Sequence, residues 1–237
     1  MSTIAIVGAG PQLGLAIART FGSQGFNVAL ISRNREKLDG FVDTLAAEGI
    51  TAAAFPADLL DHDALTQALK DAAAQFGGID VLEYSPVGSL GTTVMTRPSE
   101  TDPSHLDQEM KFQVHGAIAA TKAVLPAMRE AGAGTLLYTT GGSINPEVPI
   151  ANINAAMAAL RNWAMNLHNE LAGTGVQAAH VCIDTAIGTS MLPGIPAAQP
   201  EQIAPLYWDL HKNKRDEAEL FFTIDEGAWR TWAFRRA

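Results

Sequence analysis

Short apolar runs rich in β-branched residues alternate with longer segments rich in alanine and leucine, and this alternation restricts the fold more than any other feature. Strands separated by helices pair in parallel through right-handed crossovers. Several runs are continuously apolar, as expected when helices cover both faces of a sheet. The sequence predicts an α/β fold, a single-domain doubly wound Rossmann fold with a parallel central sheet flanked by helices on both faces. The predicted strands are 3–7, 27–32, 51–56, 79–85, 134–140 and 175–183, and the predicted helices include 36–48, 63–75, 105–129 and 154–171.

The whole chain, residues 1–237, is interpreted as one domain, because it shows no repeat, no low-complexity segment and no stretch long enough to be a linker. Hydrophobic residues make up 47% of it, which is ample for a sizeable core. Residues 184–205 are rich in Gly, Pro and Thr and predict a substrate loop. Residues 207–237 predict a C-terminal extension that packs on the core or on another subunit.

Charge and cysteine usage exclude several classes of partner. The net charge is −9 and no run of Lys or Arg is long enough to follow a phosphate backbone, which argues against nucleic acid and anionic membranes. The single cysteine, Cys182, lies in an apolar run and predicts a buried thiol, with neither a disulfide framework nor a metal-ligand pair. No signal segment precedes the first strand and no apolar stretch reaches about 18 residues. We expect a cytoplasmic protein that binds a small-molecule substrate and no metal.

A glycine loop joins the first strand to the first helix. Gly8 permits a tight turn, Gly10 lets the backbone approach a pyrophosphate, and Gly14 allows the helix to pack closely on the strand. Gln12 and Leu13 lie between them, where the free N–H groups of a helix N-terminus face an anion. The loop therefore predicts a dinucleotide site, and the alternative is an ordinary strand-to-helix turn.

The end of the second strand indicates which dinucleotide binds. An NAD-binding protein usually places a carboxylate here for the ribose 2′-hydroxyl, but this chain has Ser32 and Arg33. The Arg33 guanidinium can pair with a 2′-phosphate, and Ser32 can donate a hydrogen bond to it. The predicted cofactor is therefore NADP(H). In the alternative interpretation, Arg33 and Arg35 form a solvated start to the next helix.

These motifs resemble the short-chain dehydrogenase/reductase family from residue 3 to about residue 192. Gly8 and Gly14 have the family's spacing, although Gln12 replaces the middle glycine. The segment QVHGAIAATKAVLPAM is similar to the family's fourth helix, and NINAAMAALRNWAMNLHNELAGTGVQAAHV to its fifth helix and sixth strand. The resemblance implies that Asp58, followed by Leu59, contacts the adenine amino group and that Thr189 contacts the nicotinamide carboxamide.

The resemblance also implies a catalytic set from which this chain departs. Family members use a Tyr as proton donor, a Lys four residues later, a Ser and a supporting Asn. Alignment places Ile153 at the Tyr position, Met157 at the Lys position, Thr140 at the Ser position and Gln113 at the Asn position. Ile153 and Met157 cannot move a proton, so we predict an atypical active site that lacks the Tyr-Lys pair.

Other side chains are candidate proton carriers. Tyr138 lies two positions before Thr140 on the same strand, hence on the same face, and Tyr84 ends the neighbouring strand. His115 lies in the predicted helix 105–129, and Asp184 would act as an acid only if burial raised its pKa. For Tyr138, Tyr84 and His115 the alternative is a packing role.

Three functions follow from this combination. The first is an NADP(H)-dependent oxidoreductase acting on a carbonyl, an imine or an activated double bond. The second is a catalytically inactive cofactor-binding protein, and the third is a non-redox cyclase or isomerase that uses the same pocket. Apolar residues on the predicted helix 154–171 and the two-fold helix pairing of related proteins predict a homodimer or homotetramer. These residues are Leu160, Trp163, Met165 and Leu167.

Overall fold

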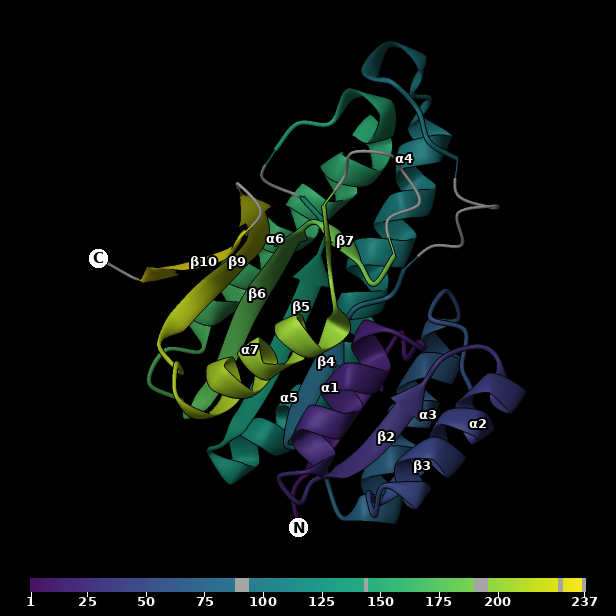
Figure 1. Cartoon of the computed structure of the whole chain (residues 1–237), viewed down its shortest axis with the longest axis vertical. Coiled ribbons are helices and arrows are strands. Elements are labelled where there is room, and N and C mark those ends of the chain that lie inside the picture. Colours follow the sequence, from purple (N-terminus) through teal and green to yellow (C-terminus); the bar gives the residue numbers. More distant parts are fainter. Residues whose placement is uncertain (88–93, 143–144, 190–195, 226–227, 236–237) are drawn as a thin grey trace.

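A central twisted sheet organises the molecule (Figure 1). The computed structural model describes residues 1–87, 94–142, 145–189, 196–225 and 228–235. Within them eight strands form one sheet in the order β3-β2-β1-β4-β5-β6-β9-β10, parallel except for the antiparallel edge strand β10. The strands are β1 (Thr3–Val7), β2 (Asn27–Ile31), β3 (Ala52–Ala54), β4 (Val81–Tyr84), β5 (Gly134–Thr140), β6 (Val176–Asp184), β9 (Glu217–Asp225) and β10 (Ala228–Arg235).

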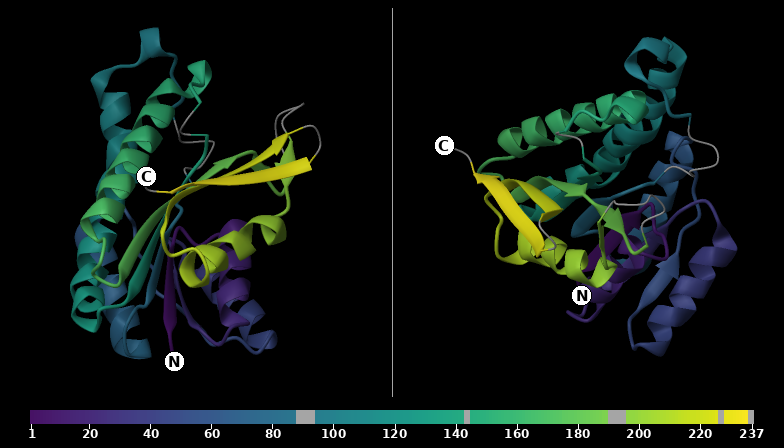
Figure 2. Two further views of the ribbon diagram at one scale, coloured as in Figure 1. Left: turned by 90° about the vertical axis from the view of Figure 1, so that its left-hand side faces the viewer. Right: turned by 45° about the horizontal axis from the view of Figure 1, so that its top comes forward.

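Helices cover both faces of the sheet (Figure 2). Helices α1 (Leu13–Gly22), α2 (Arg35–Ala47) and α7 (Pro200–Lys212) pack on one face. Helices α3 (His62–Phe76), α5 (Gly116–Ala131) and α6 (Ala151–Glu170) pack on the other, and α4 (Pro103–Met110) lies against α6. Two apolar cores result, one on each side of the strands. The predicted fold class, a doubly wound α/β domain, is confirmed.

Local chemistry explains where several elements begin and end. Strands β1 and β2 are buried at every position, which fits their continuously apolar sequences. The side chains of Asn34 and Asp61 accept hydrogen bonds from the first turns of α2 and α3. Gly77 and Gly132 end α3 and α5 in the left-handed conformation. These signals are local, so the predicted strands and helices agree with the structure to within a few residues.

The predicted helix 105–129 is interrupted by a π-helical turn at Lys111–His115. The Tyr84 hydroxyl donates a hydrogen bond of 2.7 Å to the Phe112 carbonyl, and a Cβ at Gly116 would overlap that hydroxyl. The Tyr84 hydroxyl thus lies against the helix and binds one of its carbonyl groups at the π turn, where insertion of a side chain disturbs the regular helical ladder. One predicted helix is therefore α4, the π turn and α5.

The C-terminal third is more regular than the sequence suggested. Residues 207–237, expected as an extension, contain the end of α7 and then β9 and β10, which join the central sheet at its edge. The expected loop 184–205 contains the short parallel pair β7 (Ala186–Ile187) and β8 (Ala197–Ala198) and the start of α7. Part of that loop, 190–195, lies outside the described residues. Among the helices that the structure describes, none is long and apolar enough to cross a membrane.

Candidate functional site

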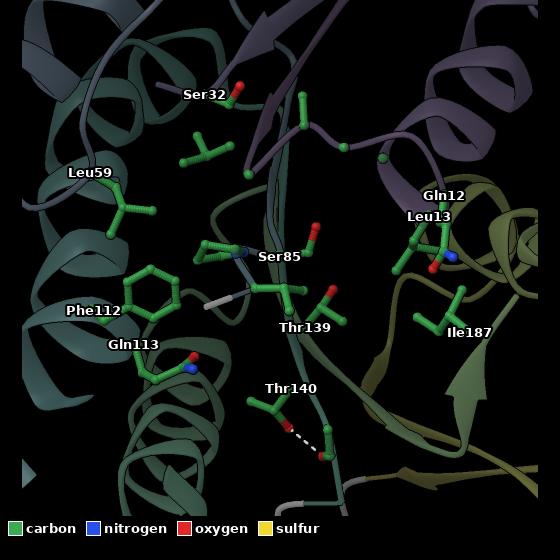
Figure 3. Close-up of a pocket in the computed structure, with 18 of the residues that line it drawn as sticks. Gln12, Leu13, Ser32, Leu59, Ser85, Phe112, Gln113, Thr139, Thr140 and Ile187 are labelled. Atoms are coloured by element: carbon green, nitrogen blue, oxygen red, sulfur yellow. Dashed lines mark hydrogen bonds between the residues drawn. The ribbon is translucent and has the colours of Figure 1, made fainter. Parts of the chain in front are cut away.

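A cavity of about 670 Å³ opens beyond the carboxyl ends of β1, β2, β4 and β5 (Figure 3). This is where open α/β sheets bind their ligands, and the volume suits a small-molecule site. Most of the lining is apolar, with a few polar groups at the two ends. The predicted cofactor residues that line it are Gly8, Gly10, Gln12, Leu13, Gly14, Ser32, Arg33 and Leu59.

The glycine loop forms one wall of the cavity. Gly8 has a φ of +96°, and a Cβ there would lie 2.6 Å from the Pro86 Cα, so only glycine fits. A Cβ at Gly14 would lie 3.1 Å from the Ala9 Cα, which reflects close packing of α1 on the loop. No side chain caps α1, and the N–H groups of Leu13 and Gly14 have no partner in the described chain. Free amides at a helix N-terminus suit a pyrophosphate.

Gln12 lines the cavity and lies on the same side of it as Leu13 and Ile187 (Figure 3). Its side chain passes so close to Gly188 that a Cβ there would lie 2.7 Å from the Gln12 Nε2. Gly188 has a φ of +74°, which also favours glycine. The residue that replaces the family's middle glycine therefore bridges the first loop and the segment after β7.

The end of β2 is cationic. Arg33 is exposed, lines the cavity and has no hydrogen-bond or ion-pair partner in the described chain. Lys37 in α2 also lines the cavity, and sequence reasoning missed it. Lys37 could have been identified from its position in the first turn of the helix, three residues after the N-cap Asn34. Arg35 instead pairs with Asp39 at 2.9 Å.

Two predicted cofactor residues do not reach the cavity lining. Asp58 is exposed, and its Oδ1 accepts a 3.0 Å hydrogen bond from the Leu60 N–H, while the adjoining Leu59 lines the cavity. Thr189 is exposed beyond Ile187 and is not part of the lining. Their expected contacts with adenine and with the carboxamide stay predictions.

The predicted catalytic positions meet at the inner end of the cavity. Thr140, Gln113, Ile153 and Met157 all line it, from β5, the π turn and α6. Figure 3 shows Thr140 and Gln113 on this side, below Thr139. The four aligned positions therefore all border one cavity. An acid that sequence reasoning missed, Glu109 of α4, is buried and also lines the cavity, and burial raises the pKa of its carboxyl.

Tyr138, a predicted proton carrier, does not line the cavity. It shares a face with Thr140, as alternation predicts, but lies deeper in the sheet and is fully buried. Its hydroxyl lies 2.6 Å from the Thr121 Oγ1, and its ring packs edge-on against Trp163. Burial raises the pKa of this hydroxyl, which the Thr121 hydrogen bond offsets only in part. A role for Tyr138 as a proton carrier stays a prediction.

The other candidate proton carriers also lie away from the lining. Tyr84 is buried, with its hydroxyl on the Phe112 carbonyl, and burial raises its pKa. His115 is exposed, with its ring against His62. Asp184 is half-buried and accepts a 2.9 Å hydrogen bond from the Asn145 Nδ2.

A buried polar array extends from Thr140 toward the edge of the sheet. The Thr140 Oγ1 lies 2.9 Å from the His180 Nε2, and the His180 Nδ1 lies 2.9 Å from the Glu219 Oε1. Both oxygens of Glu219 accept hydrogen bonds from Arg161, at 2.5 and 2.6 Å. Burial lowers the pKa of His180 despite the Glu219 contact. Burial alone would raise the pKa of Glu219, but His180 and Arg161 hold it below its usual value.

A second buried acid lies on the opposite face of the sheet. Glu83 in β4 is fully buried, with its carboxyl oxygens 2.9 Å from the Ser85 Oγ and 3.0 Å from the Thr139 Oγ1. Burial raises its pKa to about 8, with the two hydroxyl groups opposing the rise. The Thr139 Oγ1 also lies 2.7 Å from the Tyr207 hydroxyl, and Ser85 and Thr139 line the cavity.

Sequence reasoning missed Glu83, His180 and Glu219, although each interrupts an apolar strand, in DVLEYS, QAAHVCI and EAELFF. A charged or titratable residue inside a buried strand requires a hydrogen-bond or ion-pair partner, so these three positions could have been predicted to form buried polar contacts. Among the residues that the structure describes, no group of three or more His, Cys, Asp or Glu side chains is placed to hold a metal ion.

The fold and the cavity define a Rossmann-type dinucleotide-binding protein. The family model for short chain dehydrogenase matches residues 2–199. An uncharacterized oxidoreductase of Staphylococcus aureus strain MRSA252 is 29% identical over 192 residues, which is 79% of this chain and 80% of the relative. The chain belongs to the short-chain dehydrogenase family and is an oxidoreductase of that type.

Solved structures agree with this assignment. A metagenomic short-chain oxidoreductase in complex with NADP is 26% identical, with a TM-score of 0.76 and 90% of each chain covered. The actinorhodin polyketide ketoreductase with NADPH is 21% identical and supports the fold alone, with a TM-score of 0.81 over 90% of this chain and 91% of the other.

Proposed function

We propose that this protein is an NADP(H)-dependent oxidoreductase that acts on a small organic substrate with a carbonyl, an imine or an activated double bond. The unpartnered amides at the start of α1 would hold the pyrophosphate, and Ser32, Arg33 and Lys37 would hold the 2′-phosphate. A bound nicotinamide supplies or accepts a hydride. The mostly apolar inner cavity, with Thr140 and Gln113 in it, would position the substrate.

The observation that carries the cofactor assignment is the exposed Arg33 at the end of β2. It faces the cavity without an acidic partner in the described chain, and no carboxylate is present at that strand end to bind a ribose 2′-hydroxyl. The NADP complex of the metagenomic relative supports the same choice.

Titration of the intrinsic fluorescence with NADPH and NADH tests this assignment. A hydrogen bond to a charged group contributes about 1.5–3 kcal/mol, so NADPH should bind roughly 10- to 150-fold more tightly than NADH. Arg33→Ala should weaken that preference, with Ser32 and Lys37 still in place, and leave NADH affinity unchanged. Arg35→Ala is the matched control, because Arg35 pairs with Asp39 and does not line the cavity. Equal affinities of the wild type for the two cofactors would contradict the proposal.

The apolar residues at the inner end support a second candidate, an NADP(H)-binding protein without turnover or a non-redox enzyme. None of the three tyrosines in the chain is followed by a lysine four positions later. Ile153 and Met157 occupy the cavity where the alignment places the Tyr and the Lys. NADPH oxidation measured with a panel of ketones, aldehydes and imines separates the two functions. Turnover supports the oxidoreductase, whereas tight NADPH binding without any turnover supports the second candidate.

A further inference from the structure

Buried charge beneath the cavity is unusually well organised around one hydroxyl. His180 and Glu219 are fully buried, and Arg161 reaches them from α6. Burying two charges costs desolvation free energy, and the attraction between the charges offsets this cost only when the hydrogen bonding is good. A buried ion pair is therefore weak evidence that its residues serve only to stabilise the fold. Thr140, which hydrogen-bonds to His180 and lines the cavity, connects this buried polar array to the cavity.

Hydrogen-bond accounting fixes the tautomer of His180. Glu219 is ionised, since its pKa lies below its usual value and Arg161 donates to both of its oxygens. A carboxylate only accepts, so the His180 Nδ1 carries the proton and donates it to Glu219. The His180 Nε2 is then an acceptor, and the single proton of the Thr140 hydroxyl has two acceptors at 2.9 Å, the His180 Nε2 and the Gly141 carbonyl. The Gly141 carbonyl also accepts a hydrogen bond from the Cys182 thiol at 3.1 Å, so the Thr140 proton can turn toward the His180 Nε2.

We infer that Thr140, His180 and Glu219 form a proton-transfer chain, in which the Thr140 Oγ1 exchanges a proton with the substrate and His180 holds it. This inference rests on the proposed function. Glu219 and Arg161 act through His180 as positioning residues, since they orient the ring and stabilise the imidazolium. This proton-transfer chain would take the place of the family's Tyr and Lys, whose aligned positions, Ile153 and Met157, line the same cavity.

The chemistry balances for oxidation of an alcohol. The carbinol hydrogen would leave with its electron pair as hydride to a bound NADP⁺, and the substrate hydroxyl would lose its proton to the Thr140 Oγ1. The proton of Thr140 passes to the His180 Nε2, and the carbon–oxygen double bond forms. Reduction is the reverse and consumes the proton held on His180. Because burial lowers the pKa of His180, the imidazole is neutral at neutral pH, and the proton-transfer chain then favours removal of a proton from the substrate.

The charged and titratable groups around His180 determine whether a pH profile can be assigned to its imidazole. Glu219 of β9 and Arg161 of α6 are the charged groups that face it. The titratable neighbours on the sheet are Tyr138, its partner in β5, and Cys182 in β6. Tyr138 is engaged with Thr121 and Cys182 with the Gly141 carbonyl, so a pH profile that follows the imidazole is assigned to His180.

Nitrogen NMR of the protein without cofactor tests the geometry independently of turnover. The chain has six histidines, and the signals of His180 are those lost in His180→Gln. We expect a protonated Nδ1 and an unprotonated Nε2 with a pKa below the ordinary 6.5. Thr140→Val should shift the Nε2 resonance and leave the Nδ1 proton in place. A protonated Nε2, or a ring unaffected by Thr140→Val, would overturn the inference.

Kinetics with NADP⁺ and a panel of secondary alcohols test the role. We expect kcat to rise with pH to a plateau, with the pKa that NMR gives for His180. Thr140→Val should lower kcat roughly 10²- to 10⁴-fold without changing NADPH affinity, and Thr140→Ser should restore most of it. Thr121→Val is the matched control, because Thr121 is equally buried but lies outside the cavity lining.

The outcomes separate the two proposals. A wild-type protein that binds no NADPH, or that turns over none of the substrates, contradicts the proposed function. The proposed role of the proton-transfer chain is then contradicted as well. If turnover of the wild type persists in Thr140→Val, the proton-transfer chain is overturned and the proposed function stands. Loss of turnover in Glu109→Gln would then identify Glu109 as the acid.

Discussion

Replacing Glu83 by Gln tests whether the carboxyl beneath the cavity is protonated in the folded protein. Glutamine has nearly the same size and can still hydrogen-bond to Ser85 and Thr139, but it cannot ionise. Burial raises the pKa of Glu83 from 4.5 to about 8, although the hydroxyl groups of Ser85 and Thr139 oppose the rise. In the unfolded chain the carboxyl returns to its ordinary value.

The sign of the effect follows from proton counting. Between pH 4.5 and about 8 the folded state keeps a proton that the unfolded state has lost, so stability falls as pH rises through this window. At 1.36 kcal/mol for each pH unit, the whole window corresponds to about 5 kcal/mol. Burial lowers the pKa values of His180 and His211, which act in the opposite direction but only below 6.5. Above that pH, Glu83 still accounts for about 2 kcal/mol.

Urea unfolding followed by tryptophan fluorescence, from about pH 6.5 to about pH 8, measures this contribution. We expect Glu83→Gln to gain about 2 kcal/mol relative to wild type across that range. Glu130→Gln, at an exposed position on α5, should run parallel to wild type. Parallel curves for wild type and Glu83→Gln would show that Glu83 is ionised in the folded state and would refute the reasoning.

Three further predictions use other parts of the site. Gly8→Ala should destabilise the fold by more than about 1 kcal/mol in thermal unfolding, because of its positive φ and the contact with Pro86, whereas Gly10→Ala should keep stability and lose NADPH affinity. Wild type should reduce an unactivated ketone only at a residual rate near neutral pH, and Ile153→Tyr with Met157→Lys should raise that rate in an NADPH-oxidation assay, up to roughly 10²- to 10⁴-fold. Unchanged ketone reduction in the double variant would contradict the alignment of α6. Sedimentation should show a homodimer or homotetramer, and a stable species of 25.1 kDa would contradict this.

The fold could be predicted as far as local signals reach. Strands β1 and β5 begin and end at the predicted residues, because apolar runs and flanking glycines define them without help from distant parts. The π turn could not be predicted, since it depends on the Tyr84 hydroxyl reaching the Phe112 carbonyl, 28 residues away in sequence. The last two strands, β9 and the edge strand β10, were missed for a similar reason. They follow a charged segment and gain their place only by pairing with β6 and with each other.

The candidate site divides in the same way. The glycine loop and Arg33 were predictable, because their spacing along one strand–helix–strand unit determines their positions. Strand alternation placed Tyr138 and Thr140 on one face correctly, but it carries no information on depth, and Tyr138 lies beneath α5 and α6. Apolar residues of α6 that suggested an oligomer are largely used within the subunit. Leu160 and Leu167 are core residues, and Trp163 packs on Tyr138.

The end of β5 explains how two buried titratable groups serve one cavity. Thr139 and Thr140 are consecutive, so their side chains leave opposite faces of the sheet, and both line the cavity because the strand ends there. Thr139 is paired with Glu83 on the α7 side, and Thr140 with His180 on the α6 side. Near pH 7 the carboxyl of Glu83 holds its proton, whereas the imidazole of His180 has lost one. Two neighbouring hydroxyls are therefore backed by a proton donor and a proton acceptor, an asymmetry that follows from strand alternation and from the unequal effects of burial on an acid and a base.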